Sequence, residues 1–185
     1  MTFPLSHKTI FVLDHSSYFA QSCNQPIEYD VLKSKGSGVI PAAPITKSLW
    51  TCNVEGLQEY LRIVFDIYPK DRQIRVVTSS AALNPWNCAD TINTVITKLA
   101  HVGPPKGKKD DNEYSVLHGL SCAIDCLREP TYQQQDRLER GESVKNRGRI
   151  ICLTVAKNEQ SVSHLEEYVV EAIQHHNKIS TSGDL

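Results

Sequence analysis

The stretch KTIFVLDHSSY, residues 8–18, decides how the rest of the chain is interpreted. Its apolar run, residues 10–13, ends at the carboxylate of Asp14, and hydroxyl side chains follow from Ser16 onward. A short, continuous apolar run is typical of a strand buried on both faces of a parallel sheet. Ligands of such sheets bind beyond the carboxyl ends of the strands. The stretch therefore predicts an α/β fold with Asp14 and Ser16 at a potential binding edge.

Apolar strands and amphipathic helices alternate along the chain. Continuous apolar runs predict strands at 10–13, 74–78 and 149–155. Helical spacing predicts helices at about 48–68, 89–102, 113–127 and 161–178, and a partly helical segment within 131–144. The last of these helices is expected to pack through Val162, Leu165, Val169, Ala172 and Ile173. This order predicts a Rossmann-type α/β sandwich of three layers with a mostly parallel sheet.

Two features do not fit this regular pattern. Residues 21–48 carry scattered prolines and glycines, which predicts an irregular segment with at most a short edge strand between Ile27 and Val31. Three strong strands are also fewer than the five or six of a typical sheet. We therefore expect residues 1–185 to form one domain whose sheet stops before its last strands, with flexible ends at 1–7 and 179–185.

Composition restricts the class of protein. Hydrophobic residues make up 40% of the 185 residues, which is enough for an ordinary core, and the net charge of −1 favours no particular partner. The six cysteines include no Cys-x-x-Cys pair, and no secretory leader or membrane-length apolar run is recognised. We therefore expect reduced thiols in a soluble protein of the cytosol or nucleus.

The opening loop resembles the first loop of the metal-ion-dependent adhesion site of a von Willebrand factor A (VWA) domain, Asp-x-Ser-x-Ser, but Tyr18 replaces the last Ser. Such a site holds Mg²⁺ through oxygen ligands from three loops. Asp14 and Ser16 would come from the first loop, and Ser115 could stand in for the threonine of the second. The third loop should supply an Asp, but residues 155–157 are Val-Ala-Lys. We therefore expect a VWA-like fold with a degenerate site that binds no metal or cofactor, in which Asp14 and Ser16 stabilise the turn.

A zinc site and a catalytic site are both weakly supported. His118, Cys122 and Cys126 recur every four residues, which predicts a common helix face opposite Leu120, but no fourth zinc ligand is evident. Together with Tyr114 they form a semi-polar surface that either meets a partner or faces solvent. The sequence has no nucleophile elbow, phosphate-binding loop or His-Glu-x-x-His motif, so we predict that it is not an enzyme.

A basic segment is the candidate for nucleic-acid contact. It combines five basic residues with only two acidic ones between positions 137 and 149, and its basic members are Arg137, Arg140, Lys145, Arg147 and Arg149. Contacts to phosphate require such clusters. A polar loop between a helix and a strand can have the same composition, so both interpretations stay open.

Longer stretches of the chain resemble one family. They are HKTIFVLDH at 7–15, GVIPAAPITKSLWTC at 38–52, VGPP at 102–105, LHGL at 117–120 and NRGRIIC at 146–152. Each resembles, in the same order, a segment of the Integrator complex subunit 13 family, also called Asunder. The resemblance extends from His7 to Lys178 and implies the amino-terminal VWA-like domain of that family.

The resemblance also implies a function and partners. Family members belong to the nuclear Integrator complex, which processes the 3′ ends of small nuclear RNA and attenuates transcription. They pair with Integrator subunit 14 and other Integrator subunits, and the pair binds RNA or DNA. They are also linked to dynein at the nuclear envelope, mitosis, meiosis and spermatogenesis, which implies a perinuclear as well as a nuclear location. A non-enzymatic scaffold domain is therefore expected. The alternative is a metal-dependent VWA domain in which Asp14, Ser16 and Ser115 hold Mg²⁺ for a partner's carboxylate.

Overall fold

A three-stranded parallel sheet forms the centre of the molecule. The computed structural model describes residues 7–27, 30–32, 38–41, 44–68, 72–79, 81–86, 90–106, 116–142, 147–156 and 158–182. The sheet has the order β6-β1-β7 and is built from β1 (His7–Leu13), β6 (Gln73–Thr78) and β7 (Arg147–Leu153). All three predicted strands are confirmed, each within a few residues of its expected bounds.

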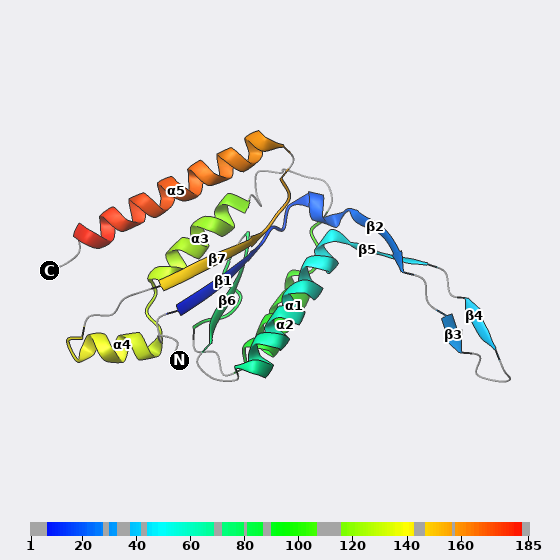
Figure 1. Ribbon diagram of the computed structural model, residues 1–185, viewed down its shortest axis with the longest axis horizontal. Helices are drawn as coiled ribbons and strands as arrows, with labels where there is room; N and C mark the ends of the chain where they lie inside the picture. The colour runs from blue at the N-terminus through cyan, green and yellow to red at the C-terminus, as the bar shows by residue number, and fades with distance from the viewer. Residues whose placement is uncertain are drawn as a thin grey trace.

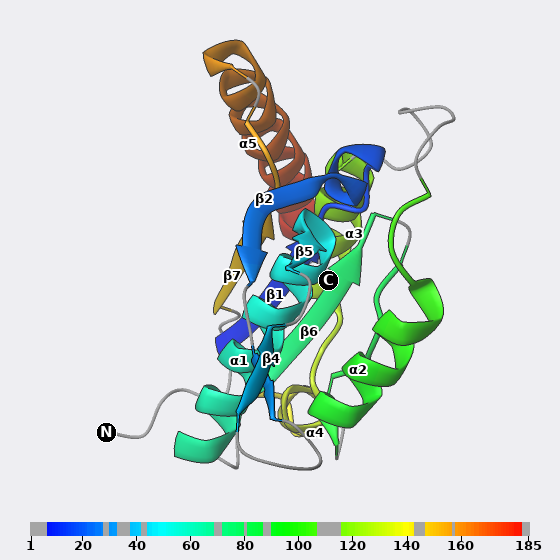
Figure 2. The same ribbon diagram turned by 90° about the vertical axis from the view of Figure 1, so that its right-hand side faces the viewer.

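Helices cover both faces of this sheet (Figure 1, Figure 2). One face carries α1 (Leu49–Ile67) and α2 (Thr91–Val102). The opposite face carries α3 (Val116–Arg128) and α5 (Glu159–Ser182), and α4 (Tyr132–Glu139) leads from α3 towards β7. The predicted VWA-like sandwich of three layers is confirmed. In the described residues, no helix has both the length and the apolar character needed to cross a membrane.

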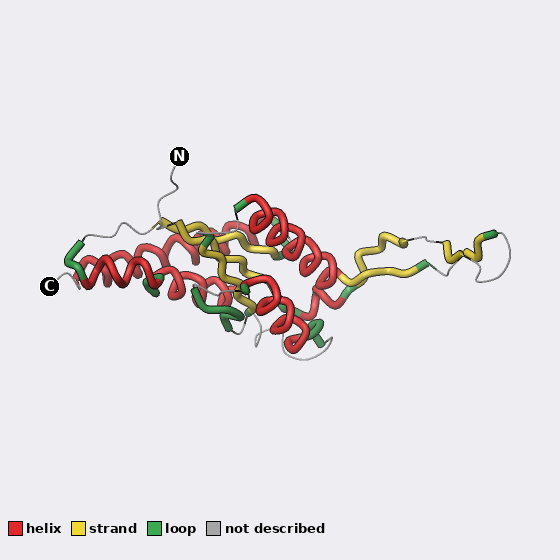
Figure 3. The backbone as a smooth tube through the Cα atoms, turned by 90° about the horizontal axis from the view of Figure 1, so that it is seen from below, coloured by secondary structure: helices red, strands yellow, loops and turns green. Residues whose placement is uncertain are grey.

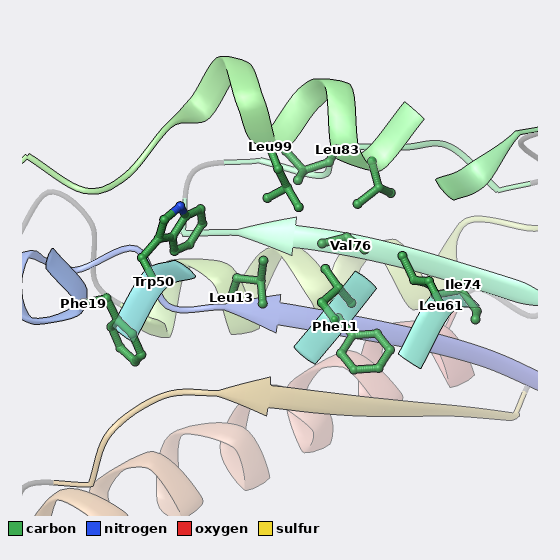
Figure 4. Close-up of a cluster of buried hydrophobic side chains, with 11 residues drawn as sticks. Phe11, Leu13, Phe19, Trp50, Leu61, Ile74, Val76, Leu83 and Leu99 are labelled. Atoms are coloured by element: carbon green, nitrogen blue, oxygen red, sulfur yellow. The ribbon is translucent and has the colours of Figure 1, made fainter. Parts of the chain in front are cut away.

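The alternation of side chains along β1 separates the core into two clusters. Phe11 and Leu13 point towards α1 and α2, where they meet Trp50, Leu61 and Leu99 (Figure 4). Ile10 and Val12 point the other way, towards α3. Both faces of β1 are therefore buried, which is why its residues 10–13 are apolar without interruption.

Local sequence signals set where the helices begin and end. The Ser48 side chain accepts a hydrogen bond from the backbone N–H of Thr51 at the start of α1, and Asp90 caps α2 in the same way. Gly103, with φ at +68°, ends α2. Gly119 lets α3 approach the sheet closely, because an added Cβ there would lie 2.9 Å from Val12 Cγ1.

The prediction of an irregular segment at 21–48 is wrong. The described part of this region contains two antiparallel pairs, β2 (Ser22–Ile27) with β5 (Ile45–Ser48) and β3 (Asp30–Leu32) with β4 (Val39–Pro41). They form an arm that projects from the body of the molecule (Figure 1, Figure 3). The arm lacks an apolar period because most of β2 and β5 is exposed, and backbone hydrogen bonds hold the strands together.

The last helix also differs from its prediction. It extends to Ser182, four residues beyond the predicted Lys178. Leu165 and Val169 pack against the sheet as expected, but Val162 and Ile173 are 47% and 40% exposed. The apolar stripe of α5 is therefore only partly covered.

Candidate functional site

The carboxyl end of β1 places Asp14 at the sheet edge predicted for a ligand. Asp14 is only 6% exposed, and both of its carboxylate oxygens accept hydrogen bonds. Oδ1 accepts from the backbone N–H of Ser16 at 2.9 Å, and Oδ2 accepts from the Thr154 hydroxyl at 2.6 Å. Asp14 therefore stabilises the turn, as predicted. Ser16 contributes its backbone N–H, while its side chain makes no capping bond to the short helix η1 (Ser17–Ala20).

His15 connects this loop to its neighbours. Its backbone N–H donates to Ser79 Oγ after β6 at 3.2 Å, and its Nε2–H donates to the carbonyl of Gly103 after α2 at 2.9 Å. The imidazole also packs edge-on against Trp50, with ring centroids 4.7 Å apart. The polar groups of this edge therefore bind one another and tie three loops together.

The described residues do not fit the magnesium ion that a VWA adhesion site holds. Both Asp14 oxygens are already engaged, and the bulky ring of Tyr18 packs beside Phe19. Val155 and Ala156, which follow Thr154, offer no side-chain oxygen. Within the described ranges, no three His, Cys, Asp or Glu side chains are grouped as metal ligands. Ser115 and Lys157, the other positions considered, lie outside the described residues.

The predicted face of His118, Cys122 and Cys126 is not formed. Cys126 is 3% exposed and packs in the same cluster as Leu120, whereas His118 is exposed. The reason is helical drift: at 3.6 residues per turn, two steps of four residues rotate the direction by about 80°. Burial raises the pKa of the Cys126 thiol to about 12. Tyr114, the fourth member, lies outside the described residues.

Cys152 is a second thiol whose pKa is raised by burial. Burial, and secondarily the negative charge of Asp14, raises the pKa of Cys152 on β7 to about 12. A thiol with such a raised pKa is a poor nucleophile at neutral pH. In the described part of the chain, all cysteines are free of disulfide bonds.

The basic residues proposed for nucleic acid are spread over two places. Arg137 and Arg140 lie at the end of α4, where they pair with Glu142 at 3.9 Å and Asp136 at 2.7 Å. Arg149 lies on β7 and reaches across β1 towards α1. Arg147 begins β7, but its side chain, like the whole of Lys145, lies outside the described structure. The residues of this segment that are described therefore do not form one patch.

A buried cationic cluster at the other end of the sheet was missed by the sequence analysis. Lys8 is fully buried and donates from Nζ to the carbonyls of Leu127 and Glu129 at the end of α3. Arg75 on β6 pairs with the Glu129 carboxylate, and both cations lie over the Trp86 ring at 5.4 and 5.3 Å. Burial lowers the pKa of Lys8 to about 8. The available signal was a charged residue inside each of two apolar strands.

Comparison with known proteins places the chain in a family. A family model described as "Cell cycle and development regulator Mat89Bb" matches residues 3–185. Integrator complex subunit 13 of Homo sapiens and of Mus musculus are each 44% identical over 98% of this chain, and protein asunder of Drosophila persimilis is 35% identical over 97%. These matches cover 27%, 26% and 28% of the relatives, so the chain spans roughly a quarter of their length. The chain belongs to the Integrator complex subunit 13 family, in which the Drosophila relatives are named asunder.

Proposed function

We propose that this chain is a non-enzymatic scaffold domain that assembles into an Integrator complex and so serves small nuclear RNA 3′-end processing and transcription attenuation. The observation that carries the proposal is the match of nearly the whole chain to proteins named as a subunit of that complex. In this proposal residues 1–185 act as a single VWA-like domain. Its location is the nucleus and the perinuclear cytoplasm, and its cellular roles are in mitosis, meiosis and dynein placement.

The geometry of the carboxyl edge supports an interaction role over catalysis. Asp14 is committed to the turn, and His15 Nε2 is committed to the Gly103 carbonyl. A general base must instead reach the proton of a substrate or nucleophile. The metal-dependent alternative gains no support from this edge, because the described donors do not match what Mg²⁺ requires.

Exposed apolar side chains supply surfaces on which a scaffold can bind its partners. Ile27 and Ile45 form a cross-strand pair on the projecting arm and are 38% and 49% exposed. On α5, Val162, Val170 and Ile173 are similarly exposed. Grouped apolar side chains on a surface are a common mark of protein–protein contact. We infer that the arm contacts a partner subunit, with Integrator subunit 14 as the first candidate.

Co-expression with Integrator subunit 14 followed by size-exclusion chromatography tests this proposal. The expected result is co-elution of the two proteins. When Ile27 and Ile45 are both changed to Asp, the amount of partner that co-elutes should fall at least tenfold. The matched control changes Tyr132 and Leu138 of α4 to Asp; both are more than half exposed and lie far from the arm, so co-elution should not change. Separate elution of two folded proteins would contradict the proposal. RNA and DNA binding by the co-eluting pair is then measured on the same sample.

A further inference from the structure

The arm joins the body of the molecule beside the first turn of α1 (Figure 1). Ser22, the first residue of β2, pairs with Ser48, which is both the last residue of β5 and the N-cap of α1. The backbone N–H of Leu49 also donates to the carbonyl of Gln21 at 2.9 Å. The start of β2 and the first turn of α1 are therefore held side by side.

Two cysteine side chains meet at this junction. Cys23 follows Ser22 on β2 and is the one residue of that strand that is half-buried, while the others are exposed. Cys52 lies one helical turn after Ser48, and the side chains of a helix point back towards its amino-terminal end. The two thiols are hydrogen-bonded to each other. Both are half-buried, and neither belongs to a disulfide bond. The junction therefore holds a pair of adjacent, partly accessible thiols.

The strand that carries Cys23 is bulged at this point. The pairing of β2 with β5 shifts its register between Ser22 and Pro26, so Cys23 has no partner residue in the ladder. Asn24, the next residue, has φ at +54°, a left-handed conformation that is uncommon outside glycine. Its backbone N–H donates to Ser22 Oγ at 3.1 Å, which holds the bulge in place. Bulges re-aim side chains, and this one accounts for the burial of Cys23 in an otherwise exposed strand.

The two thiols differ in acidity. Backbone hydrogen bonds, that with Gln25 foremost, and the hydrogen bond with Cys52 lower the pKa of Cys23. Burial, followed by the hydrogen bond with Cys23, raises the pKa of Cys52. The thiolate is the form that attacks an oxidant, so Cys23 suits the attacking role and Cys52 the resolving role. An accessible cysteine of low pKa beside a resolving cysteine is the arrangement found in redox-sensing sites.

We propose that Cys23 and Cys52 are a redox site at which a peroxide forms a reversible disulfide that fastens the arm to α1. The Cys23 thiolate attacks one oxygen of hydrogen peroxide, the O–O bond breaks, and the departing hydroxide takes up the proton that Cys23 released. Cys23 is then a sulfenic acid. The Cys52 sulfur attacks the Cys23 sulfur, the S–O bond breaks, and the oxygen leaves as water with the proton of Cys52. Two thiols and one peroxide thus give one disulfide and two waters. A dithiol reductant reopens the bond by exchange and is itself oxidised to a disulfide.

Peptide mapping after mild oxidation tests this inference. The reduced 185-residue chain is treated with hydrogen peroxide at low protein concentration, free thiols are blocked with N-ethylmaleimide, and the chain is digested without reductant. The expected product is a peptide pair joined through Cys23 and Cys52, which forms at least tenfold faster than any other disulfide and is lost on treatment with dithiothreitol. A main product that involves another cysteine, or a bond found only in disulfide-linked dimers, would overturn the proposal.

The same oxidation in concentrated urea shows whether the fold brings the thiols together. Unfolding removes their proximity, so the bond between Cys23 and Cys52 should form at least tenfold more slowly. Equal rates in the folded and unfolded chain would contradict the inference. Neither measurement needs a substituted chain or a partner protein, so both are independent of the proposed function.

Serine variants assign the two roles. In Cys52→Ser, dimedone should trap a sulfenic acid on Cys23 at least fivefold faster than it traps one on Cys52 in Cys23→Ser. The reverse order would overturn the assignment of Cys23 as the attacking thiol. The matched control is Cys122→Ser, which removes a half-buried thiol of α3 that is also hydrogen-bonded to a cysteine, Cys126. This control should leave the rate of the bond between Cys23 and Cys52 unchanged, and thermal melting shows that each variant is folded.

Discussion

The polar side chains at the two ends of the parallel sheet differ in the partners of their hydrogen bonds. At the carboxyl end, where a VWA domain would bind its ligand, both Asp14 oxygens are used by Ser16 and Thr154. At the amino end, Arg149 donates hydrogen bonds to Thr9 and Tyr60 and lines a pocket. A buried carboxylate without partners is costly, so the hydrogen bonds of Asp14 stabilise the folded chain. The difference teaches that, at the edge where a VWA domain binds its ligand, the described polar side chains of this chain bind one another.

The largest expected effect comes from removing the buried carboxylate of Asp14 at the carboxyl end of the sheet. Asp14→Ala removes two hydrogen bonds to a buried carboxylate and leaves a backbone N–H and a hydroxyl without that partner. We expect the free energy of unfolding to fall by about 3 kcal/mol. Urea denaturation, followed by tryptophan fluorescence, measures this loss.

Thr154→Val is the graded control, because it removes only one of the two bonds and should cost about half as much. Both titrations are repeated with 5 mM Mg²⁺, which we expect to leave every unfolding curve unchanged. Stabilisation of the unsubstituted protein by Mg²⁺, absent in Asp14→Ala, would show instead that the edge holds a metal.

The amino end also carries the buried cation Lys8, whose titration gives the next largest effect. Burial lowers its pKa from 10.5 to about 8. Between these pH values the unfolded chain binds the extra proton, so stability rises with pH from about 8 to 10.5. The rise is at most about 3.5 kcal/mol, since one pKa unit corresponds to about 1.4 kcal/mol. Urea denaturation at pH 7.5, 8.5 and 9.5 measures it.

Lys8→Met removes this titration while keeping a long side chain in the site. The raised pKa values of Cys126 and Cys152 lower stability above pH 9 in both proteins, so only the difference between the two curves is informative. The unfolding free energy of the unsubstituted protein should increase relative to that of Lys8→Met as the pH rises above 8. If the unfolding free energies of the two proteins change in parallel over the whole pH range, folding does not lower the pKa of Lys8.

The fold was predictable because its signals are local. The strand at β1 follows from one apolar run, and Ser48 and Asp90 mark the helix starts with capping side chains. The arm was not predictable because exposed strands such as β2 have no apolar period, and their register depends on backbone bonds to a distant segment.

At the two ends of the sheet, the sequence predicted the position of single residues but not their partners across the strands. The position of Asp14 at the carboxyl edge follows from the end of its apolar run. Its partner Thr154 follows only from the β1–β7 register, in which Leu13 lies beside Leu153. The same register places Arg149 beside Thr9 and so builds the amino-terminal pocket. Spacing along the sequence indicated neither pair, because each joins residues about 140 positions apart.

A smaller effect tests whether the amino end is held rigid. Tyr60→Phe removes the hydroxyl that accepts from Arg149 and leaves the ring against Phe11. We expect a loss of about 1 kcal/mol in unfolding free energy, the usual value of one such bond. Tyr132→Phe is the matched control, because Tyr132 is 77% exposed and its change should lie within about 0.5 kcal/mol of zero. Equal results for the two variants would mean that Arg149 is not fixed by Tyr60.

The smallest expected effect distinguishes Arg149 from the arginines of α4. Arg140 pairs with Asp136 at 2.7 Å, but both side chains are more than half exposed. Arg140→Met should therefore change the unfolding free energy by less than about 0.5 kcal/mol at low salt. In 1 M NaCl the Debye length falls to about 3 Å, so that difference should vanish while the Asp14→Ala loss persists. A salt-resistant loss in Arg140→Met would instead give the pair between Arg140 and Asp136 a buried electrostatic role.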